Sequence, residues 1–155
     1  MIKMTYVWRG VVIFLLLFLA GCTTSSEETP SAELQATIYK SPTCGCCVSY
    51  TAYLENEGWN IETITTNNMA SIKQQYSIPR NMESCHTMMV EGYFVEGHVP
   101  MEAIDKLLTE RPDIDGIALP AMPAGSPGMP GVQTDPWVIY ALKDGQVSEF
   151  MIMEG

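Results

Sequence analysis

Three cysteines within four consecutive positions constrain this chain more than any other feature of its sequence. Cys44, Cys46 and Cys47 lie in the run Thr-Cys-Gly-Cys-Cys. Before it, Ala36–Lys40 has the β-branched and aromatic residues of a strand. After it, apolar residues recur at helical spacing as far as Gly58. The triplet therefore lies where a strand passes into a helix, and the partial positive charge of a helix N-terminus favours thiolates there.

The N-terminal residues have the pattern of a bacterial lipoprotein signal. Lys3 and Arg9 come before the short apolar run Val11–Leu19. Leu19, Ala20 and Gly21 then lie directly before Cys22. The run is short for a membrane span, although a transmembrane anchor is the alternative. The pattern predicts a signal peptide over residues 1–21, lipidation of Cys22 and an extracytoplasmic, membrane-anchored protein. Thr23 favours the outer membrane if the cell is Gram-negative.

Composition separates a tether from a folded domain. Residues 22–33 are rich in Ser, Thr, Glu and Pro, which is typical of a flexible tether. Residues 34–155 carry the folding patterns, and a domain of this length buries enough surface to fold without disulfides. The formal net charge of −10 disfavours a nucleic acid partner.

The element order predicts an α/β fold of the thioredoxin-like class. The expected elements are, in order, a strand at 36–40, a helix at 46–57, a strand at 59–65, a helix capped by Asn68 and ended by Pro79, strands at 86–90 and 93–97, and a helix starting at Pro100. This order is β-α-β-α-β-β-α. A Pro/Gly-rich loop at 119–131 follows, and then a hairpin around Asp144-Gly145 that we expect to extend the sheet.

The hairpin at Glu91-Gly92 also predicts a register. A two-residue turn pairs Val90 with Tyr93, and continued pairing places Cys85 opposite His98. Cys85, His86 and His98 should then lie together at the end of the sheet where the first helix begins.

The cysteines allow two kinds of chemistry. Cys44 and Cys47 have the C-x-x-C spacing of redox enzymes. A further alternative is a pair of structural disulfides, for example Cys44–Cys47 and Cys46–Cys85. Redox exchange, however, requires neither Cys46 nor the Cys85-His86 pair. Sulfur-rich sets with imidazole select copper(I), zinc or iron–sulfur clusters, and copper is favoured outside the cytoplasm. Zinc bound by three cysteines and a histidine is the less favoured alternative.

Other donors are secondary candidates. His98 is a ligand candidate only through its predicted pairing with Cys85. Met122 and Met129 lie in the Pro/Gly-rich loop, and a thioether is a good copper(I) donor, although methionine more often fills cores.

Three motifs in order, YKSPTCGCC, SCHTMMVEGYFVEGHVP and GSPGM, resemble the bacterial CopG-like copper-resistance family, long catalogued as a domain of unknown function. The resemblance runs from about Ile38 to Met129. It implies a thioredoxin-like fold and extracytoplasmic copper binding, with a multinuclear copper–thiolate cluster as one form. The matching positions are Cys44, Cys46, Cys47, Cys85, His86 and His98.

The chain departs from the family pattern outside these residues. Ala121 replaces the glycine of Pro-Gly-Met-Pro, Tyr50 stands where the family often has tryptophan, and Pro130 replaces a glutamate. The hairpin from Trp137 onward is also absent from the expected pattern. No departure affects a cysteine or histidine of the matching set.

Three hypotheses follow, and the sequence leaves open whether the protein is an enzyme. The favoured one is a membrane-tethered copper(I)-binding protein that sequesters, transfers or changes the redox state of copper, with other copper-handling proteins as candidate partners. The second is a periplasmic thiol–disulfide oxidoreductase using Cys44 and Cys47. The third is a disulfide-stapled module that binds a protein partner.

Overall fold

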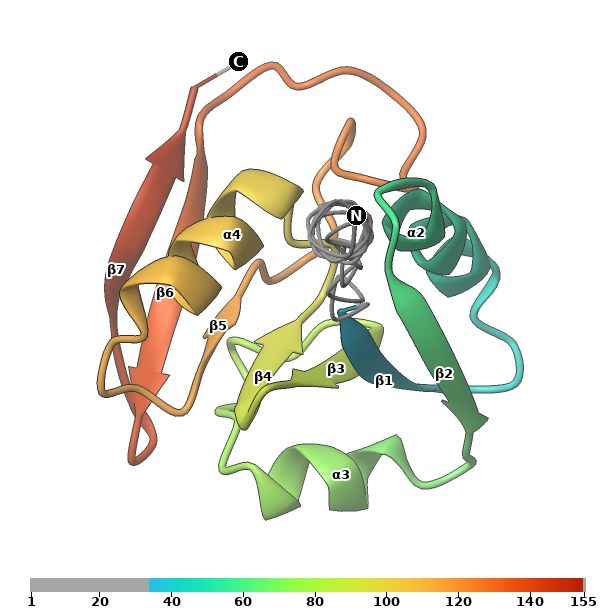
Figure 1. The fold of residues 1–155 in the computed structure, drawn as a ribbon, viewed down its shortest axis with the longest axis horizontal. Coiled ribbons are helices and arrows are strands. Elements are labelled where there is room, and N and C mark those ends of the chain that lie inside the picture. Colours follow the sequence, from blue (N-terminus) through green and yellow to red (C-terminus); the bar gives the residue numbers. More distant parts are fainter. Residues whose placement is uncertain (1–33, 155) are drawn as a thin grey trace, which may run out of the picture. The chain divides into compact units, whose positions relative to one another are not determined.

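The computed structural model describes residues 34–154 and arranges them around a seven-stranded sheet (Figure 1). The strands are β1 (Gln35–Lys40), β2 (Asn60–Thr65), β3 (His86–Val90), β4 (Tyr93–Glu96), β5 (Gly116–Ala118), β6 (Trp137–Lys143) and β7 (Gln146–Met153). The helices are α2 (Gly45–Asn56), α3 (Met69–Gln75) and α4 (Met101–Glu110). The predicted signal peptide, Cys22 and the whole tether lie outside the described residues.

The strand order confirms the predicted thioredoxin-like class. The sheet runs β2-β1-β3-β4-β5-β6-β7. β1 pairs parallel with β2 and antiparallel with β3, and β3 pairs antiparallel with β4. The chain passes through β-α-β-α-β-β-α from β1 to α4, which is the predicted order. α3 ends earlier than expected, at Gln75 rather than near Pro79, and Asn68 caps its start by accepting from the Ser71 amide at 3.2 Å.

Strand β5 was not predicted from the sequence. It has three residues and pairs parallel with β4 and antiparallel with β6. A strand this short shows no alternation of polar and apolar residues, so a pattern search does not find it. The hairpin β6–β7 turns at Asp144-Gly145 and extends the sheet as predicted, but it joins the sheet through β5.

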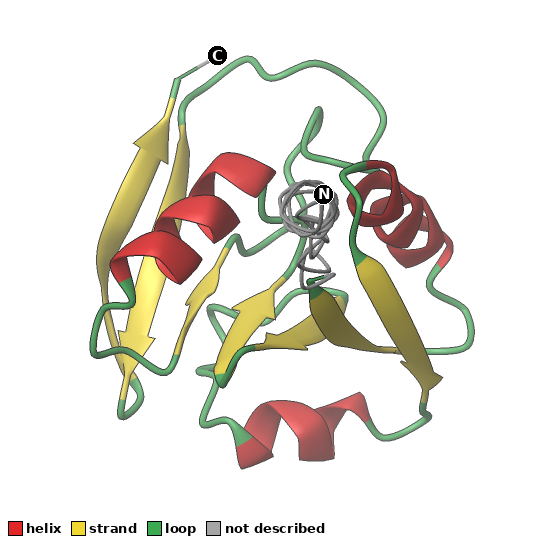
Figure 2. Ribbon diagram, in the orientation of Figure 1, coloured by secondary structure: helices red, strands yellow, loops and turns green. Residues whose placement is uncertain are grey.

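Helices cover both faces of the sheet (Figure 2). α2 and α4 pack on one face over a core that contains Ile38, Tyr50, Leu54, Met88, Val95, Ile104 and Leu107. The other face has a smaller core of Ile78, Met82, Phe94, Ala118 and Leu142, on the side of α3. Within residues 34–154, no helix is both long and apolar enough to cross a membrane.

The β3–β4 hairpin has the predicted register. Val90 pairs with Tyr93 and Thr87 with Glu96. Glu91 and Gly92 both have positive φ, at 46° and 90°, as a two-residue hairpin turn requires. Beyond the last strand pair, the Gly97 amide donates to the His86 carbonyl at 3.2 Å, so the pairing continues toward Cys85 and His98.

Candidate metal centre

The first turn of α2 carries three of the four clustered cysteines. Cys44 is the N-cap residue, with an extended backbone and no side-chain capping bond, and the helix begins at Gly45. Cys44 and Cys47 form a disulfide, with their Cα atoms 5.5 Å apart. Cys46 is a free thiol and half-buried, whereas Cys47 is fully buried. One helical turn therefore presents a disulfide and an adjacent thiol to the end of the sheet.

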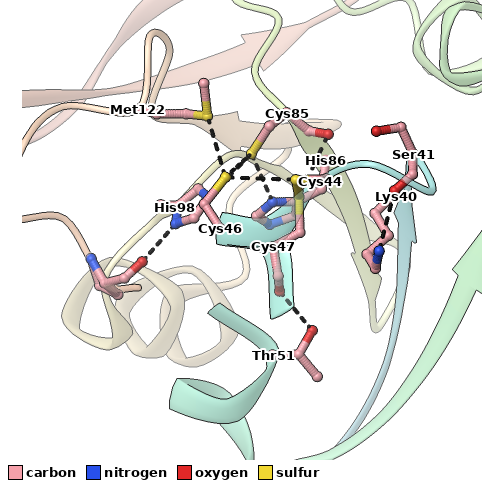
Figure 3. The surroundings of a disulfide bond; sticks show 11 residues. Lys40, Ser41, Cys44, Cys46, Cys47, Thr51, Cys85, His86, His98 and Met122 are labelled. Atoms are coloured by element: carbon pink, nitrogen blue, oxygen red, sulfur yellow. Dashed lines mark hydrogen bonds between the residues drawn. A yellow bond between two sulfur atoms is a disulfide. The ribbon is translucent and has the colours of Figure 1, made fainter. Parts of the chain in front are cut away.

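Cys85 brings a fourth sulfur to the triplet (Figure 3). The Cys46 Sγ lies 3.6 Å from the Cys44 Sγ and 3.9 Å from the Cys85 Sγ. The Cys47 Sγ lies 3.8 Å from the Cys85 carbonyl oxygen. All four sulfurs lie within 4.8 Å of one another, which is close enough for them to share a cation.

Of the two disulfides considered from the sequence, the structure contains Cys44–Cys47 and not Cys46–Cys85. The Cys46 and Cys85 sulfurs remain thiols in contact distance. Binding of a cation by all four cysteines therefore requires that the Cys44–Cys47 bond first be reduced.

Two imidazoles lie on the other side of Cys85. The Cys85 Sγ is 3.1 Å from the His98 Nε2 and 3.4 Å from the His86 Nδ1. The His98 Nδ1 donates to the Pro127 carbonyl at 2.6 Å, which fixes the proton on Nδ1 and leaves the Nε2 lone pair facing Cys85. The His86 Nε2 is buried without a hydrogen-bond partner. Cys85, His86 and His98 thus form a second group of donors that shares Cys85 with the cysteine cluster.

Burial sets the protonation states of these groups. Burial lowers the pKa of His86 well below its usual value, with further lowering by His98 and Lys73. Burial also lowers the pKa of His98, opposed by its hydrogen bond to Pro127. Burial and the neighbouring Cys46 raise the pKa of Cys85 to about 12. Without a cation the imidazoles are neutral and Cys85 is a thiol, so a metal that binds the sulfur displaces its proton.

Tyr50 supports both imidazoles, a role that the sequence analysis missed. Its ring centroid lies 4.7 Å from that of His86 and 5.0 Å from that of His98. Its hydroxyl donates to the Val99 carbonyl at 2.8 Å. Tyr50 was expected as one of the apolar positions of the first helix, and its spacing gave no sign of contact with the histidines.

The Pro/Gly-rich loop brings one of its two methionines to the cluster. The Met122 Sδ lies 3.9 Å from the Cys46 Sγ. Among the described residues, no such contact is found for the sulfur of Met129. The loop is seated on α2 at Gly128, where a Cβ atom would lie 2.6 Å from the Tyr50 backbone nitrogen. The two methionines, equivalent candidates in the sequence, are therefore not equivalent in the structure.

A buried ion pair near Cys85 was also missed. Lys73 on α3 contacts Glu96 on β4, and both side chains are buried. Burial raises the pKa of Glu96, opposed by its contacts with Lys73, Thr87 and Ser84. The sequence held a signal for Lys73, because it lies on the same helical stripe as Met69, Ile72 and Tyr76.

The donor atoms fit a soft cation. Thiolates and neutral imidazoles bind copper(I) and zinc, whereas calcium and magnesium prefer oxygen. The Met122 thioether beside the thiols is a soft donor as well. The fold and the donors together define a thioredoxin-like domain with a cluster of sulfur and imidazole groups at the start of its first described helix.

Comparisons with known proteins agree with this class. Two solved structures, named copper resistance protein CopG form 1 and form 2, match the chain with a TM-score of 0.73 and sequence identities of 38% and 37%. Each match covers 79% of this chain and 99% of the other. A family model described as a protein of unknown function, DUF411, matches residues 82–129. A search of curated proteins found no match.

The chain therefore belongs to the CopG family. The family-model match contains Cys85, His86, His98 and Met122, whereas the three cysteines of α2 lie before it. The structural matches cover 79% of this chain, which is more than the family-model match at residues 82–129. They also cover more than the segment from Ile38 to Met129 that shows the resemblance in sequence.

Proposed function

We propose that this protein binds copper(I) outside the cytoplasm and sequesters it, transfers it or changes its redox state as part of copper tolerance. The observation that carries the proposal is the gathering of four cysteine sulfurs within 4.8 Å of one another. Thiolate clusters select copper(I), and sulfurs this close are able to bridge more than one cation. The names of the two structural relatives support copper as the cargo.

In this proposal Cys44, Cys46, Cys47 and Cys85 are the ligands. His98 completes the set through Nε2, and His86 completes or flanks it through Nδ1. Met122 is a secondary ligand because its sulfur lies beside Cys46. Zinc would use the same atoms and is the less favoured cation.

The Cys44–Cys47 disulfide makes copper binding dependent on reduction. A thiol reductant supplies two electrons and two protons, the sulfur–sulfur bond breaks, and the reductant becomes a disulfide. The two new thiols then lose their protons as they bind copper(I). The reduced state is therefore the copper-binding state.

For location, we propose that residues 1–21 are removed as a signal peptide and that a lipid on Cys22 anchors the protein to a membrane. Residues 22–33 would tether the domain, and the outer membrane is the destination if the cell is Gram-negative. Labelling with a radioactive fatty acid and cell fractionation would check this, with Cys22→Ser as the control that should lose the label.

A second function, thiol–disulfide exchange, is favoured by one observation. Cys44 and Cys47 have C-x-x-C spacing and are joined in the structure. In this alternative Cys44 is the nucleophile and Cys47 is the resolving thiol. Cys44→Ser would then abolish insulin reduction, while Cys46→Ser would leave it unchanged.

An anaerobic copper(I) titration of the fully reduced protein against a competing chelator tests the leading proposal. The wild-type protein should bind one or more copper ions tightly, and Cys46→Ser and Cys85→Ser should each lower the stoichiometry or affinity. Val48→Ser is a matched control, because it introduces the same serine at an exposed position of α2. Weak binding that Cys46→Ser does not change would rule out a copper site at the triplet.

A further inference from the structure

The buried pair Lys73–Glu96 lies on the opposite face of the sheet from the buried histidines. Lys73 is 5% exposed and Glu96 is fully buried. Glu96 shares its face with Phe94 and the core on the α3 side, because side chains alternate along a strand. Burying two charges is costly even when they are paired, and an apolar pair would fill the same space. The cost of burying both charges makes the contacts that they form worth examining.

The Glu96 carboxylate contacts two other segments of the chain. Its Oε1 accepts from the Ser84 amide at 2.5 Å and also from the Lys73 ammonium. Its Oε2 accepts from the Thr87 hydroxyl at 2.6 Å. Lysine and a backbone amide are donors only, so Oε1 has to be an acceptor for both. Glu96 therefore ties α3 to the backbone nitrogen of Ser84, the residue directly before Cys85.

The hairpin holds the same segment from a second direction. The Gly97 amide donates to the His86 carbonyl at 3.2 Å. A Cβ atom on Gly97 would lie 2.7 Å from the Ser84 Oγ and 2.5 Å from the Leu119 carbonyl oxygen, so Ser84 packs directly over this glycine. The segment Ser84–His86 is thus fixed at both ends, and the Cys85 thiol projects between them toward Cys46 and His98.

We propose that Glu96, itself held by Lys73, is a positioning residue that fixes the Ser84 peptide and thereby holds the Cys85 thiol beside Cys46 and His98 before a cation binds. The proposal rests on the proposed function in that copper(I) is the cation. The position of the Cys85 thiol relative to Cys46 can, however, be tested without copper. Loss of preorganisation should weaken binding, because the free segment would have to be ordered each time a cation binds.

Four variants separate positioning from simple stabilisation. Lys73→Met/Glu96→Leu, called the double variant below, removes the acceptor of the Ser84 amide without leaving a lone buried charge. Lys73→Met/Glu96→Gln, called the rescue variant, likewise leaves no lone buried charge but keeps a side-chain oxygen for that amide, so it should retain positioning. Thr87→Val removes a different hydrogen bond of the same carboxylate. Glu110→Gln is the matched control, because Glu110 pairs with Lys106 on the surface of α4.

The copper-free test uses diamide on the full-length protein with the Cys44–Cys47 disulfide intact. Cys46 and Cys85 lose two protons and two electrons as their sulfur–sulfur bond forms, and diamide is reduced to the hydrazine. Their Sγ atoms lie 3.9 Å apart, so the wild-type protein should cross-link readily. The double variant should cross-link about tenfold more slowly or worse, because misplacement of reacting groups is costly. Peptide mapping identifies the bond.

The second test is copper(I) affinity of the reduced protein, measured by chelator competition and by the ultraviolet absorption of copper–thiolate bonds. The double variant should bind about 10- to 100-fold more weakly, as expected when a group that orients a ligand is lost. The rescue variant, Thr87→Val and Glu110→Gln should stay close to wild type. Absence of copper binding by the wild-type protein would refute the proposed function, while the diamide test would still decide the positioning role.

A merely structural role has a different signature. If the double variant lowers the melting temperature but cross-links and binds copper as the wild type does, the positioning role is overturned. If the double variant does not fold, hydrogen exchange of the Ser84 amide in the wild-type protein decides. Strong protection supports the positioning role of Glu96, and exchange at the rate of an unstructured peptide overturns it.

Discussion

Three of the four clustered cysteines lie on the first turn of α2, whereas Cys85, His86 and His98 come from the adjoining ends of β3 and β4. We call these sets the helix donors and the strand donors. The helix donors are held by one turn of local structure, and two of them are close enough to have formed a disulfide. The strand donors depend on hairpin register, on the Lys73–Glu96 pair and on a loop carbonyl.

The comparison teaches that the two sets are controlled by different means. The helix donors are neighbours on one helical turn, and their chemical state decides whether they bind. The strand donors cannot form a disulfide within their own set, because Cys85 is its single thiol, and their position decides whether they bind. Redox conditions should therefore control cation binding by the helix donors, and distant packing contacts should control cation binding by the strand donors.

The largest effect should come from the redox state of the helix donors. Reduction of Cys44–Cys47 by a phosphine should raise copper(I) affinity by about 100-fold or more, since losing two ligands costs at least as much as disturbing their supports. Chelator competition on oxidised and reduced protein measures the difference. Cys44→Ser/Cys47→Ser is the control and should not respond to the reductant. Equal affinity in the two states of the wild-type protein would show that the disulfide sulfurs are not ligands.

A smaller effect should come from lifting the loop that supports the strand donors. Gly128 has a φ of 77° and packs against the α2 backbone, so Gly128→Ala is both strained and crowded. We expect the loss of the Pro127–His98 hydrogen bond, a roughly tenfold weaker copper(I) affinity and a melting temperature lower by several degrees.

Gly45→Ala provides the matched control for this loop variant. Gly45 also lies beside the cluster, but a Cβ atom there would meet nothing within 4 Å. The control should keep the wild-type affinity and melting temperature. If both alanine variants behave alike, seating of the loop does not matter for the strand donors.

The smallest effect should distinguish the two loop methionines. Met122→Leu should weaken copper(I) binding by about threefold, because a thioether is a neutral ligand beside charged thiolates. Met129→Leu should leave the affinity unchanged, and X-ray absorption should detect one fewer sulfur neighbour only in the first variant. An equal response of the two variants would assign the effect to loop packing.

Much of the fold could be predicted because the relevant signals are local. The helix at 46–57 and the Glu91-Gly92 turn follow from spacing and turn residues, and the register of one hairpin places Cys85 beside His98. Strand β5 could not be predicted, because its three residues are specified by neighbouring strands rather than by their own pattern.

The site was predictable to the same degree. The six clustered cysteines and histidines were found from the sequence because their residue types are unusual at those positions. The supporting residues were not, because Tyr50, Lys73 and Glu96 are ordinary in local sequence and gain their roles from residues distant in the chain. Met122 and Met129 could not be separated either, since loop conformation decides which of them reaches Cys46.

The hydrogen bond from His98 to the Pro127 carbonyl has a reciprocal consequence. It couples the seating of the loop on α2 to the orientation of an imidazole that faces the cysteine cluster. By thermodynamic linkage, if seating of the loop raises the cation affinity by some factor, a bound cation raises the equilibrium constant for seating of the loop by the same factor. If the site holds copper(I) as proposed, lifting the loop from α2 should speed release of the cation, and the loop should lift more often in the copper-free protein than in the copper-bound one.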